Sequence, residues 1–208
     1  MIVLGRRGVH KAASLLRHGG VVAIPTDTVY GLAARLDRPE ALEKIFAVKG
    51  RPASLALPVL AASVDQVVEL VGSLPEVAIE LSDLWWPGGL TMVVPAPPDL
   101  AAKVGSATNT VGVRVPSHPL AIKLLAKTGP LAVTSANRHG EEPCTSAAAV
   151  VDAFGDSGEV CAVLDGGPSS ATASTVVAVD DDAMTPIRDG VISADLLEWF
   201  LERKGRNP

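Results

Sequence analysis

Short apolar runs alternate along the chain with stretches whose apolar residues recur every three or four positions. Runs of the first kind predict buried strands, and stretches of the second kind predict amphipathic helices. The predicted strands cover residues 21–25, 55–60, 91–96, 110–115, 131–135, 160–165 and 174–179. The predicted helices cover residues 7–18, 39–49, 63–72, 75–86, 118–127, 146–154 and 193–203. Strands that alternate with helices indicate an α/β protein.

Some neighbouring strands in this pattern have no helix between them, as for 91–96 and 110–115. A parallel pair needs a long crossover connection, usually a helix, so we expect a mixed sheet of parallel and antiparallel strands. The chain shows no internal repeat and no low-complexity linker. Its 208 residues therefore predict one domain, 1–208, with a sizeable core.

The composition is that of a globular protein, with 48% apolar and 20% charged residues and a net charge of -5. An acidic total argues against broad nucleic-acid binding, which requires a basic face. Two cysteines, Cys144 and Cys161, are too few for a disulfide framework and indicate a reducing compartment. The sequence contains neither a signal-peptide pattern nor an apolar run long enough to span a bilayer, so we expect a cytoplasmic protein without membrane contact.

Four polar stretches stand beside the predicted strands and helices. PTDTVYGL (25–32) follows a buried strand, and KGRP (49–52) ends a helix. VGVRVPSHP (111–119) places Arg114 inside an apolar strand, and TSAN (134–137) closes another strand. Open α/β sheets bind ligands outside the carboxyl ends of their strands, so these stretches are candidates for one site.

Taken singly, each stretch has an ordinary structural interpretation as a turn, a helix cap or a solvated helix end. Taken together, they supply three cations that could surround an anion: Lys49, Arg51 and Arg114. They also supply four side chains for directional hydrogen bonds: Thr28, Thr134, Ser135 and Asn137. The common phosphate-loop motifs and a metal-ligand cluster are missing from the sequence. The residues thus predict a cleft for a small anionic, hydroxyl-bearing ligand, either a nucleotide or an amino acid.

The same stretches carry a resemblance to a known family. They occur in one order with WPGGLT (86–91), LDGGP (164–168), STVV (174–177) and PIRDG (186–190), over about residues 10–195. This ordered set resembles the YrdC/Sua5 family of threonylcarbamoyl-AMP synthases, in its short single-domain form. The resemblance implies a twisted mixed sheet with flanking helices and a large, positively charged concave cavity.

The resemblance also implies an activity. L-threonine and bicarbonate would form a carbamate, which attacks the α-phosphate of ATP to give threonylcarbamoyl-AMP and pyrophosphate. Mg²⁺ would accompany the pyrophosphate side of ATP. A tRNA threonylcarbamoyl transferase complex would then move the group onto adenosine 37 of tRNA. Two alternatives stay open: a YrdC-like RNA-binding protein without adenylation activity, and an enzyme that handles a different amino acid.

Residue roles follow from matching positions in the family. The set around the nucleotide phosphates, expected to be catalytic, is Lys49, Arg51, Ser135 and Asn137. The threonine-binding set is Thr28, Arg114, Thr134 and Ser174. Further nucleotide contacts are Thr110, Ala136 (through its backbone), Cys144 and Arg188. We expect loss of Lys49 or Arg51 to reduce turnover with little change in melting temperature.

The chain departs from the family pattern at several of these positions. Leu55 stands at an ATP-contact position where a polar residue is usual, and Leu60 stands near threonine where histidine is frequent. Cys144 replaces a serine, and the stretch 166–175 lacks glycines often present there. A lost charge-assisted hydrogen bond weakens binding by about ten- to a hundredfold, so these positions bear on activity.

Overall fold

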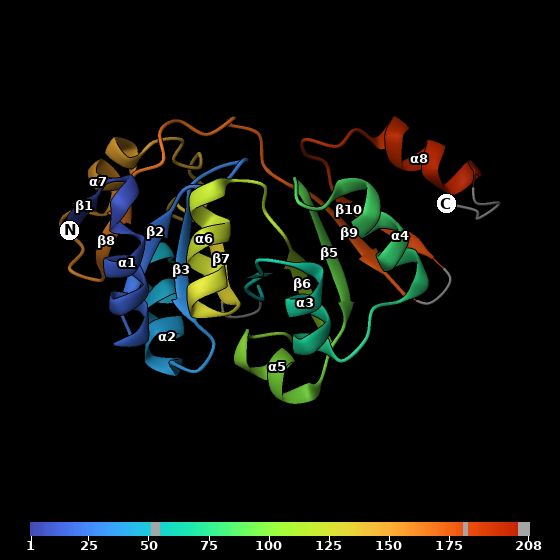
Figure 1. Ribbon diagram of the computed structural model, residues 1–208, viewed down its shortest axis with the longest axis horizontal. Coiled ribbons are helices and arrows are strands. Elements are labelled where there is room, and N and C mark those ends of the chain that lie inside the picture. Colours follow the sequence, from blue (N-terminus) through green and yellow to red (C-terminus); the bar gives the residue numbers. More distant parts are fainter. Residues whose placement is uncertain (51–54, 181–182, 204–208) are drawn as a thin grey trace.

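In the described part of the chain, ten strands form a single mixed sheet with helices packed on its faces (Figure 1). The computed structural model describes residues 1–50, 55–180 and 183–203. In spatial order the strands are β1-β8-β2-β3-β7-β4-β6-β5-β9-β10. Their bounds are β1 Ile2–Leu4, β2 Val21–Ile24, β3 Gly31–Arg35, β4 Val59–Leu60, β5 Leu90–Pro95, β6 Thr110–Arg114, β7 Leu131–Ser135, β8 Val160–Leu164, β9 Thr175–Val179 and β10 Met184–Arg188.

Eight α-helices are described, preceded by a 3-10 turn at Arg6–Gly8. Their bounds are α1 Val9–Arg17, α2 Pro39–Lys49, α3 Val64–Val71, α4 Glu76–Trp85, α5 Pro98–Lys103, α6 Pro119–Thr128, α7 Ala147–Phe154 and α8 Ala194–Arg203. The mixed α/β prediction is confirmed, and each predicted helix lies within two residues of an observed one. The predicted strand 55–60 is wrong over most of its length, because only Val59–Leu60 pairs in the sheet.

Four elements were not expected from the apolar pattern. β1 has only three residues, and β3 (GLAAR) is built from glycine and alanines, which have low strand propensity. β10 (MTPIR) contains proline, which is tolerated there because it lies at the edge of the sheet. α5 has six residues, too few to show a helical period.

The half of the sheet that contains β8, β2, β3 and β7 is covered on both faces. On one face, Val22, Ile24 and Ala33 pack in a cluster with residues of α1 and α6. On the other face, Val21 and Ala23 pack in a second cluster with residues of α2 and α7. Strands buried on both faces read as continuous apolar runs, as VVAI does.

The half that contains β6, β5, β9 and β10 is different, because burial alternates along β9 and along β6 as far as Val113. In β6, Val111 and Val113 are buried with residues of α3, α4 and α5, whereas Gly112 and Thr110 are half-buried. β9 shows the same alternation. Successive side chains of a strand point to opposite faces, so one face of this half packs on the core and the other is partly open.

Residues 165–174 connect β8 to β9 across the molecule, as the orange trace along the top of Figure 1 shows. The two strands follow each other in sequence but are separated by six strands in the sheet. The segment is fastened midway to the β2–β3 turn. Tyr30 Oη donates to Gly167 O at 2.8 Å, and Ser169 Oγ and Ser170 Oγ donate to the carbonyls of Thr26 and Thr28 at 3.0 and 3.1 Å.

Ala171, in this segment, has a φ of 73°, a left-handed conformation that glycine adopts more easily. We expect Ala171→Gly to raise the free energy of unfolding by about 0.5–1 kcal/mol, because it removes steric strain at Cβ. Ala173→Gly is the matched control, since Ala173 has no positive φ, and it should lower stability by a similar amount. Urea denaturation measures both; a loss at both positions would contradict strain at Ala171.

Candidate functional site

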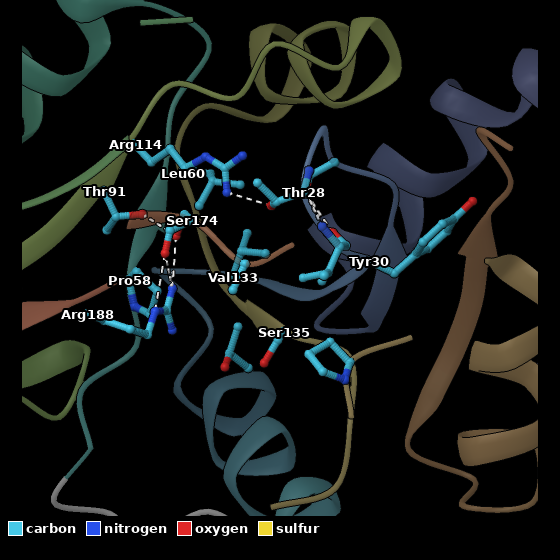
Figure 2. Close-up of a pocket in the computed structure, with 16 residues that line it drawn as sticks. Thr28, Tyr30, Pro58, Leu60, Thr91, Arg114, Val133, Ser135, Ser174 and Arg188 are labelled. Atoms are coloured by element: carbon cyan, nitrogen blue, oxygen red, sulfur yellow. Dashed lines mark hydrogen bonds between the residues drawn. The ribbon is translucent and has the colours of Figure 1, made fainter. Parts of the chain in front are cut away.

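A pocket with a volume of about 160 Å³ lies where the β2–β3 turn, β4, β6 and the end of β7 meet. Six of its lining residues have apolar side chains: Val29, Pro58, Leu60, Val133, Pro143 and Ala173. Hydroxyl side chains line it too: Thr26, Thr28, Thr91, Thr134, Ser135 and Ser174. Two guanidinium groups, of Arg114 and Arg188, complete the wall (Figure 2). The pocket therefore joins an apolar surface to cationic and hydroxyl groups.

Arg114 is the buried cation of this pocket, with only 5% of its surface exposed. Nη1 donates to Thr28 Oγ1 at 2.9 Å, as Figure 2 shows. Nε donates to Gly88 O at 2.8 Å. Nη2 lies 2.8 Å from Asp27 Oδ2 but has no aligned hydrogen-bond acceptor among the described residues. Nη2 is buried and faces Asp27, so the guanidinium is fixed in orientation; the second N–H of Nη1, beyond the one given to Thr28, is the donor that can serve a ligand.

Asp27 is a partner that the sequence interpretation did not assign to Arg114. Its other oxygen accepts from Ser117 N at 3.0 Å, so the carboxylate joins the β2–β3 turn to the β6–α6 turn. Burial lowers the pKa of Arg114, and the Asp27 charge opposes that shift. In the sequence, only the position of Asp27 next to Thr28 could have suggested that it pairs with Arg114.

The Thr28 hydroxyl keeps bonding capacity for a ligand. Thr28 Oγ1 accepts from Arg114 Nη1 at 2.9 Å and lies 3.0 Å from Thr26 Oγ1. Thr26 Oγ1 donates its proton to Val29 O and accepts from Thr28 N and Val29 N, so its own capacity is used within the turn. Thr28 Oγ1 retains a second lone pair, which suits the N–H of an amine or carbamate.

Thr91, Ser174 and Arg188 form a second polar group in the pocket. Thr91 Oγ1 and Ser174 Oγ are 2.9 Å apart, and Arg188 Nη2 donates to Ser174 Oγ at 3.0 Å and to Ser174 O at 2.8 Å. Only one proton can lie between the two hydroxyls, so the pair keeps one O–H to donate to a ligand. Burial lowers the pKa of Arg188.

Lys49, Ser135 and Asn137 come together beside the pocket, although they are far apart in sequence. The Lys49 ammonium donates to Ser135 O (2.6 Å), Asn137 O (2.7 Å) and Asn137 Oδ1 (3.0 Å). Ser135 Oγ donates to the same Asn137 Oδ1 at 2.7 Å. Because these contacts use all three N–H groups of Lys49, a phosphate that binds it must displace or share one of them.

Ala136 and Cys144 are buried behind the pocket and contribute backbone contacts to Tyr30. Ala136 N donates to Tyr30 O at 2.7 Å, Cys144 N donates to Ala136 O at 2.8 Å, and Tyr30 N donates to Cys144 O at 2.9 Å. Burial raises the pKa of the Cys144 thiol. The Tyr30 ring points away from the pocket in Figure 2, toward the crossing segment.

The other predicted residues are more distant or not described. Thr110 begins β6, whereas Arg114 ends it, so the two lie at opposite ends of one strand. Arg51 lies outside the described residues. Of the two departures, Leu60 lines the pocket and is 5% exposed, whereas Leu55 is 43% exposed. Leu60 contributes apolar surface in place of a polar contact.

Neither a metal cluster nor a membrane span is found in the part of the chain that the structure describes. There, no group of three or more His, Cys, Asp or Glu side chains is placed to hold a metal ion. None of the described helices combines the length and apolar character needed to cross a bilayer.

Two bacterial proteins share much of this sequence. The chain is 40% identical over 193 residues to the threonylcarbamoyl-AMP synthase of Bacillus subtilis (strain 168). The matched region covers 91% of this chain and 55% of that protein. The chain is also 37% identical over 155 residues to the threonylcarbamoyl-AMP synthase of Pseudomonas aeruginosa (strain UCBPP-PA14), covering 74% and 83%. The chain thus spans about half the length of the Bacillus relative.

Solved structures agree with the fold. Sua5 of P. abyssi in complex with L-threonine superposes with a TM-score of 0.88 at 34% identity, covering 96% of this chain and 60% of that one. E. coli YciO gives a TM-score of 0.84 at 24% identity and supports the fold alone. A family model for Sua5, YciO and YrdC, described as "Telomere recombination", matches residues 14–190. An α/β protein with this pocket therefore falls in a known class: the chain belongs to the Sua5/YciO/YrdC family.

The burial of Lys49 changes the expectation for its removal. Lys49 is 3% exposed, and its ammonium joins α2 to the end of β7 through three hydrogen bonds. We expect Lys49→Met to lower the free energy of unfolding by about 2–3 kcal/mol, because buried acceptors lose a charged donor. Lys123→Met, on the exposed surface of α6, is the control and should change stability by less than about 0.5 kcal/mol. Equal urea midpoints for both variants would show that the Lys49 contacts contribute little.

Proposed function

We propose that this chain is an L-threonylcarbamoyladenylate synthase, a nucleotidyltransferase that uses L-threonine, bicarbonate and ATP. The observation that carries the proposal is the Arg114 guanidinium, which Gly88, Thr28 and Asp27 orient so that the second N–H of Nη1 is left for a ligand, in a pocket that also offers apolar and hydroxyl surface. The named relatives and the threonine complex of P. abyssi Sua5 support it.

The threonine end of the pocket is assigned to Arg114, Thr28, Thr134 and Ser174. A guanidinium matches a carboxylate in geometry and charge, so Arg114 holds the amino-acid carboxylate. Thr28, as an acceptor, faces the nitrogen, and the spare O–H of the Thr91–Ser174 pair serves an oxygen. Leu60 and Val133 give the methyl group an apolar surface.

The reaction requires the protein to align the carbamate with ATP and to stabilise negative charge on the phosphates; it does not require a protein nucleophile. Threonine nitrogen and bicarbonate give a carbamate with loss of water. A carbamate oxygen then attacks the α-phosphorus, and the bond to the bridging oxygen breaks to release pyrophosphate. We assign Lys49, Arg51, Ser135 and Asn137 to the phosphates, where cations and hydrogen-bond donors offset the charge that develops. Thr110, Ala136, Cys144 and Arg188 are assigned to further nucleotide contacts.

Magnesium enters with the nucleotide in this proposal. Mg²⁺ is commonly bound by substrate phosphates and few protein carboxylates, which fits a described region without an acidic cluster. The product passes to a transferase complex that modifies adenosine 37 of tRNA, and the enzyme works in the cytoplasm.

Pyrophosphate release tests the activity directly. Purified protein is given Mg²⁺–ATP with threonine and bicarbonate, and each of the two is then omitted in turn. We expect release only with both, because the carbamate is the attacking group. Pyrophosphate release that is unchanged when threonine or bicarbonate is omitted would contradict the synthase activity. Salt-sensitive binding of double-stranded RNA without any release would favour an RNA-binding function instead.

Arg114→Lys separates charge from geometry at the threonine end. Lysine keeps the charge but cannot reach Gly88 O, Thr28 and a carboxylate at once. We expect the KM for threonine to rise about 10- to 100-fold while the KM for ATP changes little. The control is Arg7→Lys on the exposed surface. An unchanged KM for threonine would show that Arg114 does not hold the carboxylate.

A further inference from the structure

Thr175 begins β9 at a point where three segments of the chain meet, and only 1% of its surface is exposed. Its backbone N donates to Gly89 O at 3.0 Å. Its hydroxyl makes two contacts with one residue, because Oγ1 donates to Ile192 O at 2.8 Å and accepts from Ile192 N at 2.9 Å. Thr175 therefore joins β9 to the segment before β5 and to the segment after β10.

The residues next to these contacts hold the two arginines of the pocket. Gly88, which precedes the acceptor of the Thr175 N–H, accepts from Arg114 Nε at 2.8 Å. Ser174, which precedes Thr175, accepts from Arg188 Nη2 at its carbonyl (2.8 Å) and at its hydroxyl (3.0 Å) (Figure 2). The backbone bond of Thr175 thus connects the acceptor of one guanidinium to the acceptors of the other.

The segment that follows β10 packs closely against the same stretch of β9. A Cβ added at Gly190 would overlap the backbone of residues 173–175, so a larger residue does not fit there. Val191 N donates to Ala173 O at 3.1 Å. The Thr175 hydroxyl adds a side-chain fastening one residue further along this segment. The position of this stretch therefore depends on how the segment after β10 is held.

The hydroxyl distinguishes Thr175 from the valines that follow it in β9. Valine has nearly the same shape and suits a buried strand position. A buried hydroxyl is unfavourable unless its hydrogen bonds are satisfied, and here both contacts are made by the backbone of Ile192. The hydroxyl therefore serves the connection between the two segments and not the packing of the core.

We propose that Thr175 is a positioning residue, which sets the spacing between the guanidinium groups of Arg114 and Arg188. It is not among the residues that line the pocket, and it acts through Gly89 and Ile192. The inference rests on the proposed function, in which one guanidinium holds the threonine carboxylate and the other contacts the nucleotide. The carbamate must be aligned with the α-phosphorus, and a misplacement of about 1 Å reduces turnover about a hundredfold.

Thr175→Val tests the proposal, because it removes the hydroxyl and keeps the shape of the side chain. We expect kcat to fall about 10- to 100-fold, since the two substrates are no longer aligned. The KM values for threonine and for ATP should stay within about threefold of wild type, because each substrate still meets its own guanidinium. Thr175→Ser restores the hydroxyl and should recover most of the turnover.

Thr128→Val is the matched control. Thr128 is also buried, and its Oγ1 also makes two hydrogen-bond contacts, with Leu124 O at 3.1 Å and with Gly129 O at 2.9 Å, at the C-terminal end of α6. We expect both valine variants to lower the melting temperature by similar amounts, but only Thr175→Val to lower kcat. An equal fall of kcat in both variants would show that lost stability, and not lost position, is responsible.

A second measurement needs no turnover. NMR follows the Nε–H signals of Arg114 and Arg188 in the protein without substrates. We expect Thr175→Val to shift or broaden the Arg188 signal, whereas Thr175→Ser and Thr128→Val leave both signals close to wild type.

An unchanged kcat or an unchanged Arg188 signal in Thr175→Val would overturn the proposal. The two readouts also separate this proposal from the proposed function. A shifted Arg188 signal, in a protein whose wild type releases no pyrophosphate, would leave the spacing role of Thr175 standing and reject only the synthase activity.

Discussion

The charge of Arg114 must be neutralised inside the protein, and the architecture of the pocket depends on how this is done. A guanidinium that is almost fully buried is strongly destabilising unless acceptors and a counter-ion surround it. The acceptors come from separate segments: Gly88 before β5, and Thr28 and Asp27 from the β2–β3 turn. Satisfying one side chain therefore fixes three parts of the chain relative to one another. The same arrangement leaves the second N–H of Nη1 without a protein acceptor among the described residues, in the wall of the pocket.

The sequence predicted the elements with strong periodicity well, because local burial decides them. Residues 39–49 and 131–135 have the predicted bounds. Residues 55–60 were misjudged, since Leu57 N bonds to Val104 O outside the sheet and a continuous apolar run does not report pairing. β3 was missed because the partners on either side, β2 and β7, give alanine its place there. Tertiary pairing overrides propensity in such strands.

The site was partly accessible to sequence reasoning in the same way. Thr28, Arg114, Thr134 and Ser174 line one pocket as a group, and Ser135 and Arg188 join them. The three contacts of Lys49 could not be foreseen, because they depend on the packing of α2 against the end of β7. Asp27 and Thr91 were missed because they act through contacts with Arg114 and Ser174, which are distant from them in the sequence. The family pattern identifies which positions contribute to the site, whereas ion pairs and hydrogen-bond directions can be assigned only from the structure.

The connection from β8 to β9 has a mechanical consequence. Seven strand spacings of about 4.8 Å would separate these strands by about 34 Å in a flat sheet, close to the full reach of a segment of ten residues. The segment is also held midway by Tyr30 and the carbonyls of Thr26 and Thr28. Because a segment of this length has little slack, it opposes any movement that would increase the distance between β8 and β9.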